Sequence, residues 1–218
     1  MTIIIPSRTA TNLLPCLRAI RENQPHDVNL LVVDDGLTAS EQIAVYYLQA
    51  AIVSGQKPFI FARNINIGIA AAGTDDVILL NDDALLKTPG GFSALQEQSR
   101  QNPEYGIISA VTNAVGNPNQ EPKGIGLREE ARMLCFVCVY IPRRTIEQVG
   151  LLDTRYTEYG FDDDDYSLRV RQAGLKLGIF DGCFVDHASL RSTFRGNGFA
   201  DLKPNQKLFR EKWGELAA

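Results

Sequence analysis

The stretch Asn29-Leu-Leu-Val-Val-Asp-Asp-Gly36 indicates how the chain folds. Its first part, residues 29–33, is a continuous apolar run, which is typical of a strand covered by layers on both sides. Three similar short runs occur in the same half of the chain, at Thr2–Ile5, Pro58–Phe61 and Val77–Leu80. Together these runs predict a buried, mostly parallel sheet.

Segments with helical spacing separate the apolar runs, and this alternation indicates an α/β fold with a Rossmann-like central sheet flanked by helices. The predicted helices are 12–21, 41–52, 91–101, 143–149, 163–173 and about 204–214. Further strands are predicted at 106–111, 133–141, 177–180 and 184–185, and loops at 112–126 and 189–200. The pattern predicts one domain over 1–218.

Composition excludes several classes of protein. The chain has 218 residues, 44% of them hydrophobic, which is enough to build a substantial core. Its formal net charge is −4 and it has no basic block, so we expect no binding of nucleic acid or of anionic lipid. The sequence contains neither a run of about 18 to 20 apolar residues nor a signal-peptide pattern. We expect a cytoplasmic protein without a transmembrane segment.

The cysteines, and the absence of three common functional motifs, argue against several other functions. Four cysteines are too few for a disulfide scaffold, and Cys135, Cys138 and Cys183 lie in apolar segments that we predict as strands, so we expect reduced core residues. The sequence lacks the P-loop, dinucleotide-binding and Gly-x-Ser-x-Gly patterns.

Ligands of an open α/β sheet bind beyond the carboxyl ends of its strands, so the residues that follow each apolar run are the candidates for binding. These are Ser7, Arg8, Asp34, Asp35, Arg63, Asn64, Asn81, Asp82 and Asp83. Two strands that each bring two aspartates to one edge create repulsion unless cations or ligand donors offset it. A hard divalent cation would do so, although Asn81-Asp82-Asp83 also suits an ordinary turn.

Two features of the second half also suggest chemistry. The run Asp162-Asp163-Asp164-Asp165 exceeds what a helix start requires, so at least one of these carboxylates is a candidate proton acceptor. Asp165 can instead pair with Arg169 one turn later. His187 follows a strand end, where it could serve as a metal ligand or as a structural residue.

The ordered set of these segments resembles the family 2 glycosyltransferases of the GT-A fold. The segments are 2–6, 31–36, 66–68, 79–83, 141–144, 149–153, 162–169, His187 and 212–214, which span nearly the whole chain. The resemblance implies a nucleotide-sugar-binding half, 1–111, and an acceptor-binding half, 112–218. It also implies inverting transfer of a sugar from a nucleoside-diphosphate-sugar donor, with Mn²⁺ or Mg²⁺ as cofactor.

The resemblance also implies roles for individual residues. Asp35 would contact the nucleobase and Asp82 the ribose. Asp83, the last residue of a DxD-like motif, would bind the metal together with His187, and Asp163, preceded by Asp162, would be the catalytic base. The donor site is then expected to include Pro6, Asp34, Asp35, Arg63, Asn64, Asn81 and Asp82.

Some alternatives remain open at this point. Asp162 or Asp164 could replace Asp163 as the base. Ser189–Ala200 could close over the donor through Arg191 and Arg195, or be a solvated loop. The segment between Asn66 and Asn81 is shorter than in many family members, which predicts a rebuilt donor pocket. A sugar nucleotidylyltransferase, or a non-catalytic domain that binds nucleotide sugars or glycans, are the competing functions.

Overall fold

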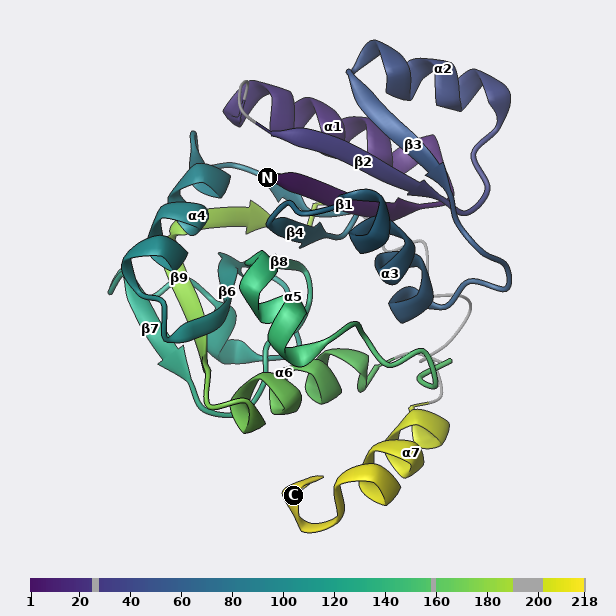
Figure 1. Ribbon diagram of the computed structural model, residues 1–218. Coiled ribbons are helices and arrows are strands. Elements are labelled where there is room, and N and C mark those ends of the chain that lie inside the picture. Colours follow the sequence, from purple (N-terminus) through teal and green to yellow (C-terminus); the bar gives the residue numbers. More distant parts are fainter. Residues whose placement is uncertain (25–27, 158–159, 190–201, 218) are drawn as a thin grey trace.

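A computed structural model describes residues 1–24, 28–157, 160–189 and 202–217. Within these residues one sheet of nine strands forms the centre of the molecule, in the order β3-β2-β1-β4-β8-β6-β9-β5, with β7 paired to β9 (Figure 1). The strands are β1 Thr2–Ser7, β2 Asn29–Asp34, β3 Ala50–Ser54, β4 Val77–Leu80, β5 Leu85–Leu86, β6 Tyr105–Thr112, β7 Leu127–Glu130, β8 Cys138–Ile141 and β9 Lys176–Asp186.

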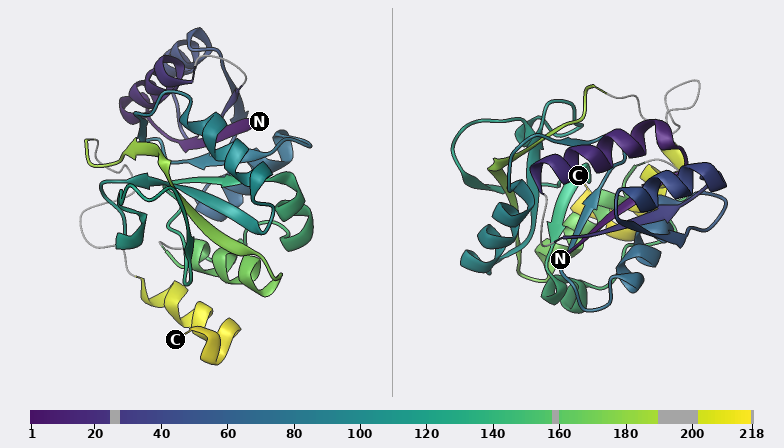
Figure 2. Two further views of the ribbon diagram at one scale, coloured as in Figure 1. Left: turned by 90° about the vertical axis from the view of Figure 1, so that its left-hand side faces the viewer. Right: turned by 90° about the horizontal axis from the view of Figure 1, so that it is seen from above.

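Helices flank this sheet on both faces and confirm the predicted fold class. They are α1 Ala10–Asn23, α2 Ala39–Tyr47, α3 Phe61–Ala71, α4 Gly91–Gln101, α5 Arg143–Val149, α6 Asp162–Gln172 and α7 Lys203–Trp213, with short 3₁₀ helices at Pro118–Gln120 and Gly214–Ala217. Helices α1 and α2 lie at one end of the molecule and α7 lies at the other (Figure 2).

The sheet has a parallel part, formed by the first four strands, and a mixed part that begins at β8. Strands β3, β2, β1 and β4 are parallel, whereas β8 runs antiparallel to both β4 and β6. In the parallel part Ile3 of β1 pairs with Leu30 of β2 and with Ile78 of β4. The carboxyl ends of β1, β2 and β4 therefore meet at one edge, as the sequence predicts.

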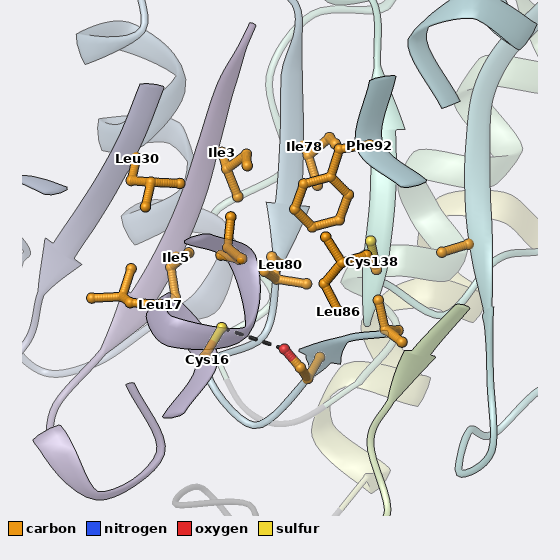
Figure 3. Packing of buried hydrophobic residues seen from close by; sticks show 14 of the residues in the cluster. Ile3, Ile5, Cys16, Leu17, Leu30, Ile78, Leu80, Leu86, Phe92 and Cys138 are labelled. Atoms are coloured by element: carbon orange, nitrogen blue, oxygen red, sulfur yellow. Dashed lines mark hydrogen bonds between the residues drawn. The ribbon is translucent and has the colours of Figure 1, made fainter. Parts of the chain in front are cut away.

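Two apolar layers cover the two faces of the sheet. Side chains of a strand alternate between faces, so Ile3 and Ile5 pack on one side while Ile4 packs on the other. The first layer joins β1, β2 and β4 to α1 and α4, where Leu17 and Phe92 are fully buried (Figure 3). The second layer packs the opposite face against α3, α5 and α6. These layers fix the strand ends that carry the polar residues.

The close packing of α3 on the sheet depends on Gly68. A Cβ atom at this position would lie 2.4 Å from Cγ2 of Ile4 and 3.2 Å from Cγ2 of Val33. We expect Gly68→Ala to lower the free energy of unfolding by about 1–2 kcal/mol, because overpacking costs about 1–3 kcal/mol and outweighs the gain of at most about 1 kcal/mol in helix propensity. Urea unfolding measures this change, and an unchanged or higher midpoint would contradict the tight contact.

Two predicted elements in the first half are wrong. The predicted helix 41–52 ends at Tyr47, and residues 50–54 form β3, which pairs in parallel with β2. Gln49 has a φ of 57°, so the chain leaves the helix there, and pairing with β2 outweighs the helical spacing. The predicted strand Pro58–Phe61 is not a strand, because Phe61 begins α3. This helix extends to Ala71, into the segment between Asn66 and Asn81 that is shorter than in many family members.

The second half differs from the prediction in detail. Of the predicted strand 133–141 only β8, Cys138–Ile141, pairs with neighbours, so Cys135 lies outside a strand. The two short strands predicted at 177–180 and 184–185 form a single strand, β9, while β5 and β7 were not predicted. Short strands of two to four residues carry too little periodic signal to be detected. All four cysteines are free, as expected.

Candidate active site

The candidate site begins where β1 and β2 end. Pro6 is buried in β1 opposite Val33. Asp34 accepts hydrogen bonds from the backbone N–H groups of Gly36 and Leu37, both at 2.7 Å, and from the Gln42 side chain at 2.8 Å. Asp34 therefore shapes the loop between β2 and α2, with one carboxylate oxygen on the loop backbone and the other on α2.

The next residue, Asp35, is a candidate for binding a ligand. It is only 6% exposed, and its backbone N–H donates to the carbonyl oxygen of Ser7 at 2.9 Å. Its Oδ2 lies 3.7 Å from the Arg8 guanidinium, whereas its buried Oδ1 has no hydrogen-bond partner among the described residues. Burial raises the pKa of Asp35, and the charge of Arg8 opposes that shift. A buried carboxylate oxygen without a partner is costly, which favours a ligand donor here.

A pocket opens beside Asp35. Its volume is about 400 Å³ and its lining consists of Arg8, Asp35, Gly36, Lys57, Pro58 and Phe59. The Arg8 guanidinium lies 5.6 Å from the centre of the Phe59 ring. The pocket thus combines a carboxylate, two cationic side chains and an aromatic ring, which suits a flat polar ring that carries an anionic group.

The segment Asn81-Asp82-Asp83 follows β4 and lies beside the end of β1. The backbone N–H of Asn81 donates to the Val137 carbonyl at 3.0 Å, which anchors the segment to the loop before β8. Oδ2 of Asp82 accepts a hydrogen bond of 2.5 Å from the Ser7 hydroxyl. Burial raises the pKa of Asp82 to about 6, and the Ser7 hydrogen bond opposes that shift. Ser7 thereby links both halves of the site, Asp82 through its hydroxyl and Asp35 through its carbonyl.

Asp83 faces His187 although the two residues are 104 positions apart in the chain. Nε2 of His187 lies 3.1 Å from Oδ1 of Asp83, and Nδ1 lies 2.6 Å from the carbonyl oxygen of Ala114. A carbonyl oxygen only accepts hydrogen bonds, so Nδ1 donates to it. In the neutral imidazole Nε2 then presents a lone pair to a carboxylate oxygen. Such a pair suits a protonated histidine or a cation bound between the two atoms.

The backbone of His187 is held by a residue that sequence reasoning missed. Oδ1 of Asn113 accepts from the His187 N–H at 2.9 Å, and Nδ2 of Asn113 donates to Oδ1 of Asp186 at 3.0 Å. Asn113 directly follows β6. Inspection of the residues after the apolar run 106–111 could have identified it, since that strand also ends at this edge of the sheet.

Arg63 and Asn64 do not follow a strand, contrary to our prediction. Both lie in the first turn of α3, which begins at Phe61. Asn64 is fully buried and its Oδ1 accepts from the backbone N–H of Gln56 at 2.8 Å, so it supports the loop that carries the pocket residues Lys57 and Phe59. Arg191 and Arg195, and all of the predicted closing loop Ser189–Ala200 except Ser189, lie outside the described residues.

The four aspartates of 162–165 form the first turn of α6, as predicted to within one residue. In Figure 1 this turn lies on the side of the molecule where β1, β2 and β4 end. Burial raises the pKa of Asp162 to about 6 and also raises the pKa of Asp164, where the charge of Arg132 opposes the shift. Burial together with the neighbouring carboxylates Asp162 and Asp164 raises the pKa of Asp163. These three groups are therefore tuned to take up a proton more readily than ordinary aspartates.

Asp165 has a structural role. It is fully buried, and its carboxylate contacts Arg169 Nε at 3.0 Å, as the sequence spacing predicts. The other oxygen contacts Lys212 Nζ at 2.6 Å and accepts a hydrogen bond from Trp213 Nε1 at 2.8 Å. These contacts leave three aspartates of the run, 162 to 164, as candidates for the base.

Within residues 1–24, 28–157, 160–189 and 202–217, no group of three or more histidine, cysteine, aspartate or glutamate side chains is arranged to hold a metal ion. In the same part of the chain no helix has both the length and the apolar character needed to span a membrane.

Comparison with known proteins identifies the class and then the family. The fold is that of the GT-A glycosyltransferases. Residues 2–173 match the family model "Glycosyl transferase family 2", and because this match covers most of the chain, the protein belongs to that family. The family therefore confirms the resemblance seen in the sequence. A search of curated proteins finds no match.

Two solved structures illustrate the likeness. The mannosyltransferase PcManGT from Pyrobaculum calidifontis, in complex with GDP-Man and Mn²⁺, has a TM-score of 0.70 at 18% identity, and the match covers 88% of this chain and 58% of that chain. GalNAc-T7 with UDP, GalNAc and Mn²⁺ has a TM-score of 0.77 at 12% identity, and the match covers 99% of this chain and 48% of that chain. The chain thus spans about half to three-fifths of the length of these proteins.

Proposed function

We propose that this chain is a metal-dependent, inverting glycosyltransferase that moves a sugar from a nucleoside-diphosphate-sugar donor to an acceptor hydroxyl. The observation that carries the proposal is the pair formed by Asp83 and His187 at the carboxyl edge of the sheet, with the imidazole fixed by Ala114 so that Nε2 faces the carboxylate. The family membership and the two Mn²⁺-containing structures support it.

The carboxylate oxygen of Asp83 and the imidazole nitrogen of His187 suit a divalent cation. Asp83 Oδ1 and His187 Nε2 would hold it, and the donor diphosphate would complete its oxygen ligands, since two protein ligands are too few by themselves. When bound, such a cation stabilises the negative charge that develops on the leaving nucleoside diphosphate. Asp82 is held by Ser7 beside this position, and it contributes a further carboxylate toward the ribose.

The nucleobase belongs, in this proposal, in the pocket at Asp35. The unpartnered Oδ1 of Asp35 would accept an N–H of the base, while Arg8 and Lys57 supply positive charge at the pocket wall. The described donor residues, from Pro6 to Asp83, all belong to 1–111, which we propose as the nucleotide-sugar half. Residues 112–218 then supply His187, the catalytic base and the acceptor site.

Asp163 is proposed as the catalytic base. It would accept the proton of the acceptor hydroxyl as that oxygen attacks the anomeric carbon from the face opposite the diphosphate, so one displacement inverts the anomeric centre. Its raised pKa suits this role, because a base must hold the proton that it takes up. Asp162 and Asp164 flank it in the same turn.

Binding of the nucleoside diphosphate that the donor releases tests the proposed donor site and its metal. We expect GDP or UDP to stabilise the chain only when Mn²⁺ or Mg²⁺ is present, by about 2.7 kcal/mol at 100 times Kd. Thermal unfolding measures the shift. Asp35→Asn should lose most of it, whereas Asp75→Asn, at the opposite end of β4, should keep it. Equal shifts with and without metal would contradict the metal site.

Turnover distinguishes the competing functions. A glycosyltransferase releases a nucleoside diphosphate from the donor, whereas a sugar nucleotidylyltransferase exchanges the donor with pyrophosphate to give a nucleoside triphosphate. Metal-dependent binding without either product would indicate a non-catalytic domain. A panel of GDP-sugars and UDP-sugars, assayed for each product in turn, separates these outcomes.

A further inference from the structure

We propose that α7 is a positioning element for the catalytic base: its side chains fix the turn that carries Asp162 and Asp163. This inference rests on the proposed function. Helix α7 lies after the range 2–173 that matches the family, at the end of the molecule remote from α1 and α2, and its contacts run to the start of α6 (Figure 2). Two independent sets of contacts join it to that turn.

The first set converges on Asp165. This carboxylate has no exposed surface and lies in the same helical turn as Asp163. Among the described residues, side chains of Tyr156, Arg169, Lys212 and Trp213 contact it. Helix α7 supplies two of these contacts, Lys212 Nζ at 2.6 Å and Trp213 Nε1 at 2.8 Å, both to Oδ1. Tyr156 OH also donates to Oδ1, at 3.1 Å. A buried charge held by several donors tolerates little movement, because any shift leaves it without a partner.

Lys212 extends this network beyond α6. Its Nζ also lies 2.8 Å from Oδ2 of Asp153, which the Arg155 side chain contacts at 2.6 Å. These contacts lower the pKa of Asp153, with the Arg155 hydrogen bond as the largest cause. One ammonium group therefore ties the segment before α6 to the first turn of α6.

The second set of contacts holds the two residues directly before the aspartates. Gly160 has a φ of 84° and Phe161 a φ of 68°, and Phe161 is the N-cap of α6. A residue with a large side chain adopts this left-handed conformation only where its surroundings enforce it. Asn205 Nδ2 donates to the Gly160 carbonyl at 2.7 Å, and the Phe209 ring packs on the Phe161 ring at 5.4 Å between centres.

Both sets act on the backbone that aims Asp162 and Asp163. The Asp165 contacts hold the turn from its inner side, and the contacts of Asn205 and Phe209 hold its entry. Lys207, by contrast, lies on the outer side of α7 and is 79% exposed, where it pairs with Glu211 at 3.7 Å. Lys207 therefore offers a matched control, a lysine on the same helix whose side chain is largely exposed to solvent.

Lys212→Met tests the inference, because methionine keeps the length of the side chain and removes its charge. In the full-length chain we expect kcat for the most active donor of the sugar-nucleotide panel to fall about 10- to 100-fold, since small misplacements of a catalytic group have effects of this size. The Kd for GDP or UDP with Mn²⁺ should stay within about twofold, because the donor residues lie elsewhere. Lys212→Arg should restore most of kcat, and Lys207→Met should leave kcat unchanged.

Hydrogen exchange provides a readout that does not depend on turnover. Amides of residues 160–166 should exchange faster in Lys212→Met than in Lys207→Met. Should Lys212→Met not fold, Trp213→Phe removes only the indole N–H and should show the same pattern more weakly. Unchanged exchange and kcat in a folded variant would overturn the inference, as would an equal loss in Lys207→Met or a parallel loss of nucleotide binding. A wild type without turnover, but with the expected exchange difference, would instead refute the proposed base and retain the positioning by α7.

Discussion

Asp83→Asn should abolish metal-dependent turnover while leaving the fold intact. Asparagine has the size of aspartate, yet it removes the anionic oxygen that faces Nε2 of His187 at 3.1 Å. We expect kcat/KM to fall by about 10³-fold or more, because a bound cation contributes several kcal/mol to the stabilisation of the leaving group and each 1.36 kcal/mol is a factor of ten. Product release at saturating Mn²⁺ measures this loss, and calorimetry should show that Mn²⁺ no longer strengthens nucleotide binding.

The matched control is Asp75→Asn, the same substitution at the amino end of β4. Asp75 accepts hydrogen bonds from Thr2 and Asn29 and contacts the amino terminus, all remote from the candidate site. This variant should lose some stability and keep its metal response. An Asp83→Asn protein with the Mn²⁺ dependence of the wild type would place the cation elsewhere.

Asp163→Asn should separate transfer from donor binding. Loss of a general base commonly costs about 10² to 10⁴ in rate, while Asp35, Asp82 and Asp83 remain unchanged. We therefore expect a transfer rate reduced by that factor and a nucleotide Kd within about twofold of the wild type. Asp162→Asn and Asp164→Asn provide matched controls in the same turn, and the larger loss should fall on Asp163.

The pH dependence follows from the same carboxylate. A base works in its deprotonated form, and burial with neighbouring carboxylates raises the pKa of Asp163 above its ordinary value. The transfer rate should therefore rise with pH as Asp163 loses its proton, and this rise should occur above the pH at which an exposed aspartate titrates.

Wild-type transfer by Asp163→Asn would refute the role of Asp163 as the base. A loss of nucleotide binding in the same variant would assign Asp163 to the donor site.

Much of the sheet could be predicted because its strands are continuous apolar runs. Strands β1, β2 and β4 agree with the prediction within a residue or two, and the residues that follow them do meet at one edge. Residues 41–61 could not be predicted in this way. There a helix ends at Tyr47, a strand follows, and only pairing with β2 decides between the two states.

Sequence reasoning identified the acidic residues of the candidate site, together with Ser7 and Asn64, but it did not identify Asn113 or the pocket residues Lys57 and Phe59. The contact between Asp83 and His187 joins two distant segments, and spacing in the sequence contains no information about it beyond the family resemblance. Ser7 is the last residue of β1 and Asn113 directly follows β6, but their hydrogen bonds to Asp82 and to the His187 backbone depend on how the strands are ordered. The pocket residue Phe59 lies within the segment 58–61 that was wrongly predicted as a strand, and Lys57 directly precedes that segment, so neither was identified as a candidate.

The stereochemistry of a metal-dependent turnover tests the central claim most directly. The wild-type chain is incubated with each sugar nucleotide and candidate acceptors, with Mg²⁺ or with a chelator, and the anomeric proton of the new glycoside is observed by NMR. The account predicts a product with the anomeric configuration opposite to that of the donor, formed only when the metal is present. A product that retains the donor configuration, or one that forms equally well with the chelator, would contradict it.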